Sequence, residues 1–168
     1  MIEISLNDSF CLRSITVSDL ENLRQWKNKH RNSFFYKEII TVEQQNKWFE
    51  SYLKDDKDYM FTVVCNEKAI GCMGFREKGD FIDVYNIMRG EKSQEQSFSM
   101  SDAFRLMLNY INHECQKKIT CVVLNDNPAF NWYLKNDFLV LKEIEDYSLL
   151  EYQPKQFSNN FKVKEITQ

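Results

Sequence analysis

The sequence lacks the features that mark membrane-spanning, secreted and nucleic-acid-binding proteins. No apolar run approaches the roughly 18 residues that a membrane-spanning helix needs. The first seven residues lack the basic and apolar regions of a signal peptide. The net charge of -3 and the pI near 5.5 provide no basic surface for nucleic acid. These absences favour a cytoplasmic protein with a small-molecule partner and no membrane contact.

The cysteines do not have the spacing of a zinc or redox site. Their number, five, is odd, and no two of them form a CxxC pair. They lie in apolar stretches predicted to be strands or helices: Cys11, Cys65, Cys72, Cys115 and Cys121. We interpret them as reduced core residues and expect no metal site.

The chain has enough apolar residues for one domain with a sizeable core. Of its 168 residues, 43% are hydrophobic and 14% are aromatic. Residues 1–153 are predicted to form this domain, and the polar residues 154–168 to form a loose tail. The sequence does not distinguish a monomer from a homodimer.

Two capping boxes predict helices in the first third of the chain. Ser18 with Glu21, and Thr41 with Gln44, have the spacing at which side chains satisfy each other's backbone donors. The first helix is predicted to run to about residue 29 and the second to about residue 53. An apolar face over 100–111 predicts a third, longer helix.

The strands are predicted from β-rich runs bounded by polar turns. A first strand is expected at 10–15, and the runs 59–65, 69–75 and 81–88 predict an antiparallel meander. The continuously apolar run 119–124 predicts a strand buried on both faces. Residues 138–151 are expected to supply two last strands.

The segment from Val122 to Phe138 predicts a ligand site. Asn127 suits a helix N-cap and Pro128 the first helical position, because proline lacks the N–H that would have no partner there. Asn125 then lies at the carboxyl end of a predicted parallel strand, where ligands of open α/β sheets bind. Tyr133 follows in the helix, where its phenol can point back to this site.

The order of these elements resembles the GNAT superfamily of acetyl-CoA-dependent N-acetyltransferases. The resemblance covers about residues 10–150 and depends on Ile70–Phe75, on Tyr85–Gly90 and on Asn125 through Tyr133 to Phe138. It implies a single α/β (α+β) domain with a mixed, mostly antiparallel sheet and helices on both faces. The fourth and fifth predicted strands, 81–88 and 119–124, are expected to splay apart around acetyl-CoA.

The N-terminal half is similar to one branch of that superfamily. The resemblance lies in Trp26-Lys27-Asn28, Arg31, Phe34, Ile40-Thr41 and Gln44 through Trp48-Phe49. This branch contains ribosomal-protein N-acetyltransferases and enzymes that acetylate amino sugars on nucleotides. We therefore expect acetyl transfer to a primary amine of a small molecule, first an amino sugar linked to a nucleotide, ahead of a polyamine or drug. A protein N-terminus is the alternative acceptor, and a non-catalytic acyl-CoA-binding module is the alternative function.

The resemblance also implies a set of residues for the cofactor. The pyrophosphate would bind the loop before Met100, at the positive end of a helix. The pantetheine arm would lie along the backbone at Ile87 and Met88. The loop departs from the family pattern, because residues 92–99 contain no glycine. The expected cofactor-binding residues are Ile87, Met88, Arg89, Lys92, Ser97, Phe98, Ser99, Asn125 and Tyr133.

Tyr133 is the expected general acid, which would protonate the departing thiolate. A backbone N–H at Ile87 or Met88 would stabilise the oxyanion. The base is left open between Asp83 and Tyr85, with Glu77 as a further candidate. Structural alternatives are a core role for the Tyr133 ring and a turn-capping role for Asn125.

The acceptor amine is expected to contact Trp26, Asn28 and Arg31, with Trp48 at the border of its pocket. A guanidinium such as that of Arg31 can bind a carboxylate or diphosphate through two hydrogen bonds. The alternatives are core packing for the two tryptophans and a helix-end charge for Arg31.

Overall fold

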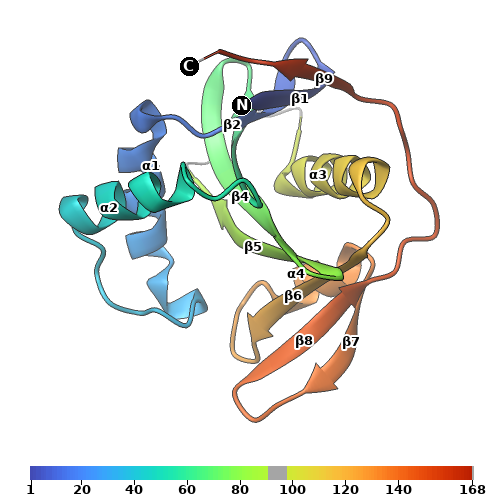
Figure 1. Cartoon of the computed structure of the whole chain (residues 1–168). Helices are drawn as coiled ribbons and strands as arrows, with labels where there is room; N and C mark the ends of the chain where they lie inside the picture. The colour runs from blue at the N-terminus through green and yellow to red at the C-terminus, as the bar shows by residue number, and fades with distance from the viewer. Residues whose placement is uncertain (91–97, 168) are drawn as a thin grey trace.

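The computed structural model describes residues 1–90 and 98–167 and places nine strands of this part of the chain in one sheet (Figure 1). The strand order is β7-β8-β6-β5-β4-β3-β2-β1-β9. The strands are β1 (Ile2–Asn7), β2 (Phe10–Ser14), β3 (Asp58–Cys65), β4 (Lys68–Lys78), β5 (Phe81–Arg89), β6 (Lys118–Leu124), β7 (Phe138–Glu143), β8 (Tyr147–Tyr152) and β9 (Lys162–Glu165).

Helices cover both faces of this sheet. The helices are α1 (Leu20–Lys29), α2 (Val42–Tyr52), α3 (Met100–Glu114) and α4 (Phe130–Lys135). In Figure 1, α1 and α2 lie on one side of the sheet and α3 on the other. The buried residues accordingly form two clusters, one beneath α3 and one beneath α1 and α2. The predicted fold class is confirmed.

The predicted meander and two of the four predicted helix starts agree with the structure. Strands β3, β4 and β5 pair antiparallel in sequence order. Thr41 and Gln44 cap α2 reciprocally, as their spacing predicts. The helix α3 begins at Met100.

The capping box before α1 lies two residues earlier than predicted. Asp19, not Glu21, accepts the backbone N–H of the capping residue, which is Thr16, at 2.8 Å. Asp19 also binds Arg13 of β2 at 2.8 Å, and this ion pair fixes the start of the helix against the sheet. Glu21 instead pairs with Arg24 on the helix surface.

Two strands at the edge of the sheet were not predicted. β1 pairs antiparallel with β2, and β9 pairs antiparallel with β1, with Ile4 opposite Val163. The prediction of a loose tail is therefore wrong for Lys162–Glu165. The sequence did not indicate this strand because all four of its residues are exposed and lack an alternating apolar pattern.

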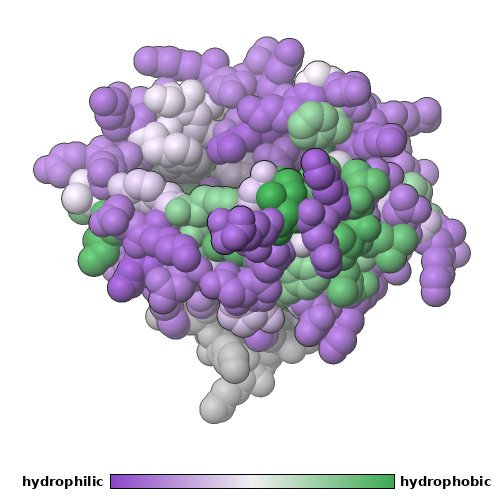
Figure 2. Space-filling model, turned by 90° about the horizontal axis from the view of Figure 1, so that it is seen from below, coloured by the Kyte–Doolittle hydropathy of each residue, from purple (hydrophilic) through white to green (hydrophobic). Residues whose placement is uncertain are grey.

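The opposite edge of the sheet carries exposed apolar side chains. Leu139 and Leu141 of the edge strand β7 are each 57% exposed. Figure 2 shows the molecule from below the view of Figure 1, with hydrophobic residues gathered on one side of a largely hydrophilic face.

Among the described residues, none of the helices is long and apolar enough to cross a membrane.

Gly90 determines how closely α1 packs on the sheet. A Cβ atom placed there would lie 2.5 Å from Cζ2 of Trp26, a buried indole of α1. Since real Cβ atoms do not approach other atoms so closely, any larger residue must push the helix outward.

We predict that Gly90→Ala lowers the free energy of unfolding by about 1–3 kcal/mol, because the added methyl group collides with Trp26. Denaturant titration of wild type and variant measures the difference. Gly79→Asn is the control, since Gly79 has open space around it and a φ of +60°, which asparagine tolerates. Equal losses in the two variants would contradict this account of Gly90.

Candidate active site

The site begins where β5 and β6 stop pairing. These strands are parallel and pair at Phe81 with Lys118, Ile82 with Ile119, and Asp83 with Thr120, and their register ends there. Beyond Asp83, β5 continues to Arg89 paired with β4, while β6 continues to Leu124 paired with β8. The two strands therefore diverge, as Figure 1 also shows, and the predicted splay is confirmed.

A β-bulge bends β5 beside this divergence. Tyr85 pairs with Gly74 and Met88 with Cys72, so Asn86 and Ile87 together face the single residue Met73. Asn86 has a φ of 49°, a left-handed conformation that asparagine accepts more readily than most residues. A bulge leaves backbone groups of the strand without a ladder partner.

Three adjoining cavities lie along the divergent part of β5. The cavity beside α3 and the central cavity share Ile87 and Tyr133 as wall residues. The central cavity and the cavity beside α2 share Lys27, Tyr36 and Asn86. The cavities thus form a continuous series from the α3 side of the sheet to its α1 and α2 side.

Tyr133 lies where the first two cavities meet. Its ring packs edge-on against Phe104, Trp132 and Phe138. Its hydroxyl forms no hydrogen bond with any described residue, and it lines both cavities. Burial raises the pKa of this phenol, so the phenol keeps its proton at neutral pH. The Tyr133 ring therefore packs in the core, while its hydroxyl is in a position suited to donating a proton.

The two candidates for the base differ in their surroundings. The Tyr85 hydroxyl donates a hydrogen bond to Asp58, whose other oxygen accepts from Arg76 Nε at 2.9 Å. Burial and the charge of Asp58 raise the pKa of Tyr85, which makes this phenol a poor proton acceptor. Asp83 lines the central cavity, and burial raises the pKa of its carboxyl. Tyr85 lines the same cavity, and the hydrogen bond from its hydroxyl to Asp58 favours Asp83 as the candidate base.

A family model described as an acetyltransferase (GNAT) domain matches residues 9–132. The chain belongs to this family. It is therefore an acyltransferase that uses acetyl-CoA as its co-substrate and acts on amines. The predicted family, enzyme class and co-substrate are confirmed.

Solved structures with this fold include three GNAT enzymes. RimL, a ribosomal-protein alpha-N-acetyltransferase in complex with coenzyme A, is 16% identical, with a TM-score of 0.68 over 89% of this chain and 94% of its own. The spermidine N-acetyltransferase of Vibrio cholerae, with CoA and spermine, is 18% identical, with a TM-score of 0.72 over 86% and 95%. FdhC, a nucleotide-linked sugar GNAT, is 12% identical, with a TM-score of 0.72 over 86% of each chain. A search of curated proteins found no match.

On the α3 side of this GNAT domain, part of the predicted cofactor set lines one cavity. Ile87, Arg89, Ser99 and Tyr133 contribute to the cavity beside α3. Met88 instead lines the cavity beside α2, and Phe98 stacks on Phe10 with ring centroids 4.5 Å apart. Lys92 and Ser97 lie outside the described residues.

Ser99 and Asn125 already have partners within the protein. The Ser99 hydroxyl caps α3 by accepting from the Asp102 N–H at 3.2 Å and donating to its carboxylate at 2.7 Å. The Asn125 amide donates to the carbonyls of Ile144 and Glu145, and its oxygen accepts from Ser148 at 2.7 Å. Asn125 thus binds the β7–β8 turn and not the turn that follows it, and its cofactor role stays a prediction.

The turn after β6 is held as expected, although the helix begins later. The Asn127 side chain accepts the N–H of Ala129 at 2.8 Å. The helix α4 starts at Phe130 rather than at Pro128, because residues 128 and 129 belong to a turn. This places Tyr133 one helical turn after the helix start.

The predicted acceptor residues do not line the cavities. Trp26 is buried against Gly90. Asn28 exchanges two hydrogen bonds with the backbone of Ile40, at 2.8 and 3.0 Å, and Arg31 donates to the Asn28 carbonyl at 3.1 Å. These contacts fix the segment before α2. Tyr36 and Ile40 of this segment line the cavity beside α2, and so does Trp48.

Lys27 is a charged residue of this site that was not among the predicted candidates. It lines both the central cavity and the cavity beside α2. Its place near the end of α1 indicates only a charge that complements the helix dipole. A more informative signal was available, because Lys27 lies four residues after Leu23 and so shares the buried face of the helix.

Proposed function

We propose that this GNAT enzyme acetylates the primary amine of a small molecule, with an amino sugar attached to a nucleotide as the favoured acceptor. One observation supports direct transfer in a ternary complex. Tyr133 and Ile87 line both the cavity beside α3 and the central cavity, so two substrates entering from opposite faces can meet there.

The divergent edge of β5 suits the extended arm of the co-substrate. Past Asp83, this edge has no pairing with β6, and a free strand edge can hydrogen-bond an extended chain through its main-chain groups. Acetyl-CoA supplies the thioester carbonyl that the amine attacks. The N–H of Ile87 or Met88, within or next to the bulge, is the proposed donor to the oxyanion.

Two side chains are proposed to move the protons. Asp83 would accept a proton from the acceptor amine, directly or through water, on the central-cavity side. Tyr133 would donate its proton to the departing thiolate, since it stays protonated at neutral pH. Acid and base would then act from the wall of the same cavity.

The charges of the cavity walls bear on the acceptor. Among the described residues, Asp83 is the one carboxylate that lines the central cavity or the cavity beside α2. A polyamine carries several positive charges and would find a single counter-charge there. The fold similarity to FdhC adds support for an amino sugar.

A protein N-terminus is the second candidate acceptor. Phe35 and Tyr36 line the central cavity while remaining 60% and 49% exposed. Exposed aromatic side chains beside a site are suited to contact a peptide. The fold similarity to RimL points in the same direction.

A thiol-release screen with acetyl-CoA tests the proposed function. It should include nucleotide-linked amino sugars, free amino sugars, polyamines and peptides with a free N-terminus. The proposal predicts the highest kcat/KM for a nucleotide-linked amino sugar. Faster release with a peptide would favour the second candidate. Calorimetric binding of acetyl-CoA without release across the panel would favour a non-catalytic binding module.

Tyr133→Phe is expected to lower kcat by about 10²-fold or more, because the variant keeps the ring but loses the proton donor. Acetyl-CoA affinity should change little. Tyr110→Phe is the matched control, since that ring packs against Phe75 and Phe161 away from the cavities. Unchanged chemistry-limited turnover in Tyr133→Phe would remove the acid role.

Asp83→Asn is expected to lower kcat/KM. It should also remove the decline of kcat/KM at acid pH that protonation of Asp83 causes. A base must be deprotonated, so wild-type activity should be lost as the pH falls through the pKa of Asp83, which burial raises. Glu77→Gln is the control, because that carboxylate pairs with Lys117 at 3.0 Å. An acid limb that persists in Asp83→Asn would assign the base elsewhere.

A further inference from the structure

Lys27 carries a charge without an opposite charge beside it. Its Nζ donates to the neutral Asn86 Oδ1 at 2.6 Å and lies 3.2 Å from the ring centre of Phe34. No ion pair among the described residues includes Lys27. The two groups that hold this ammonium are therefore an amide oxygen and an aromatic face.

This arrangement is energetically unfavourable for the protein alone. A charged group that is removed from water normally gains an ionic partner, because its lost hydration is otherwise uncompensated. Burial lowers the pKa of Lys27 to about 8, against an opposing effect of Cys72 and with a smaller lowering by the charge of Arg76. The side chain thus remains mostly charged at neutral pH while lacking a counter-ion.

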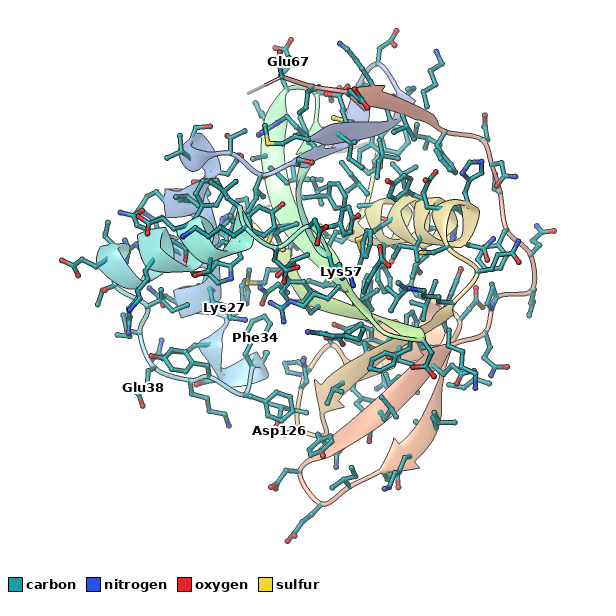
Figure 3. All side chains as sticks on the ribbon, in the orientation of Figure 1. Lys27, Phe34, Glu38, Lys57, Glu67 and Asp126 are labelled. Carbon is teal, nitrogen blue, oxygen red and sulfur yellow. The ribbon has the colours of Figure 1, made fainter. Side chains whose placement is uncertain are left out.

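The ammonium lies at the boundary of two cavities. Lys27 lines the central cavity and the cavity beside α2, each of about 260 Å³. Figure 3 shows its side chain running from α1 to Phe34. Among the described residues, Lys27 is the one cation that lines the central cavity or the cavity beside α2. The cavity beside α3 has a different cation, Arg89, on its wall.

The rest of the cavity beside α2 is uncharged and largely apolar. Its wall contains two glutamines and apolar or aromatic side chains, among them Leu23, Ile40, Trp48, Met60 and Met88. Its volume exceeds the roughly 150 Å³ of an apolar cavity that holds benzene. A ring-sized group with an apolar face therefore fits beside the lysine.

We propose that Lys27 binds an oxyanion of the acceptor, a carboxylate or phosphate oxygen, while the cavity beside α2 holds an apolar part of the same molecule. This inference rests on the proposed acetylation of a small amine and defines its acceptor further. The acceptor carries a negative charge close enough to its amine for both to occupy adjoining cavities. Polycationic amines are selected against because they would bring positive charge to Lys27.

Matched pairs of amines test this selection. One pair is glucosamine and glucosamine 6-phosphate, and another is an amino acid amide and the free amino acid. Spermidine serves as the polycation. The measurement is kcat/KM with acetyl-CoA for the wild type, Lys27→Met, Lys27→Arg and Lys29→Met. Lys29 is the control, since it is an exposed lysine of the same helix that lines none of the three cavities.

We expect wild type to prefer the anionic member of at least one pair. Lys27→Met should lower kcat/KM for that member by about 10- to 100-fold, as for a lost hydrogen bond to a charged group, and for the neutral member by much less. Lys27→Arg should retain most of the preference, and Lys29→Met all of it. The preferred pair identifies the oxyanion as phosphate or carboxylate.

If Lys27→Met lowers kcat/KM equally for the anionic and the neutral amine of a pair, Lys27 affects the acetyl group or the fold, and the inference is overturned. A wild-type preference for spermidine would also overturn it. The melting temperature of Lys27→Met should equal or exceed that of the wild type, because the substitution removes a cation without a counter-ion. If that variant unfolds, Lys27→Gln replaces it. If no amine is turned over, the proposed function fails, and calorimetry of the same anionic amines with acetyl-CoA-bound protein tests Lys27 separately.

Discussion

The end of the pairing between β5 and β6 is the constraint on which the rest of this structure depends. Three residue pairs join the strands, and after Asp83 and Thr120 each strand keeps one neighbour instead of two. A sheet interior normally satisfies all its backbone groups, so strands that separate in this way must be held from outside. Here β4 holds β5, β8 holds β6, and the side chain of Asn125 fixes the end of β6 to the β7–β8 turn.

The side chains around this separation are in environments that other parts of the fold avoid. Tyr133 has a hydroxyl that lines two cavities and forms no hydrogen bond with a described residue, and Asp83 has a carboxyl whose pKa is raised by burial. Lys27 has an ammonium without a counter-ion. Elsewhere the buried carboxylates are paired, as Asp19 is with Arg13 and Asp58 with Arg76. Unfavourable environments of this kind concentrate at functional sites, where a substrate completes the interactions.

Local sequence signals predicted most of the fold but fewer of the site contacts. The meander, the cap of α2 and the apolar face of α3 depend on neighbouring residues, and all agree with the structure. β9 could not be predicted, because its pairing with β1 joins the two ends of the chain and its exposed residues have no apolar pattern. The capping box before α1 was misplaced because Asp19 forms an ion pair with Arg13 of β2, a contact between elements that local spacing does not indicate. Trp26, Asn28 and Arg31 were expected to face the acceptor because of the family resemblance. Instead Trp26 packs against Gly90, and the other two bind nearby backbone groups, contacts that the resemblance did not indicate.

The central claim is that the divergent edge of β5 seats acetyl-CoA with its thioester beside Tyr133. A crystal structure of the complex with acetyl-CoA tests it most directly. The account predicts an extended pantetheine arm along residues 84–88, between β5 and β6, with the acetyl group between Tyr133 and Ile87. Acetyl-CoA bound at another surface, with the edge of β5 still free, would contradict it.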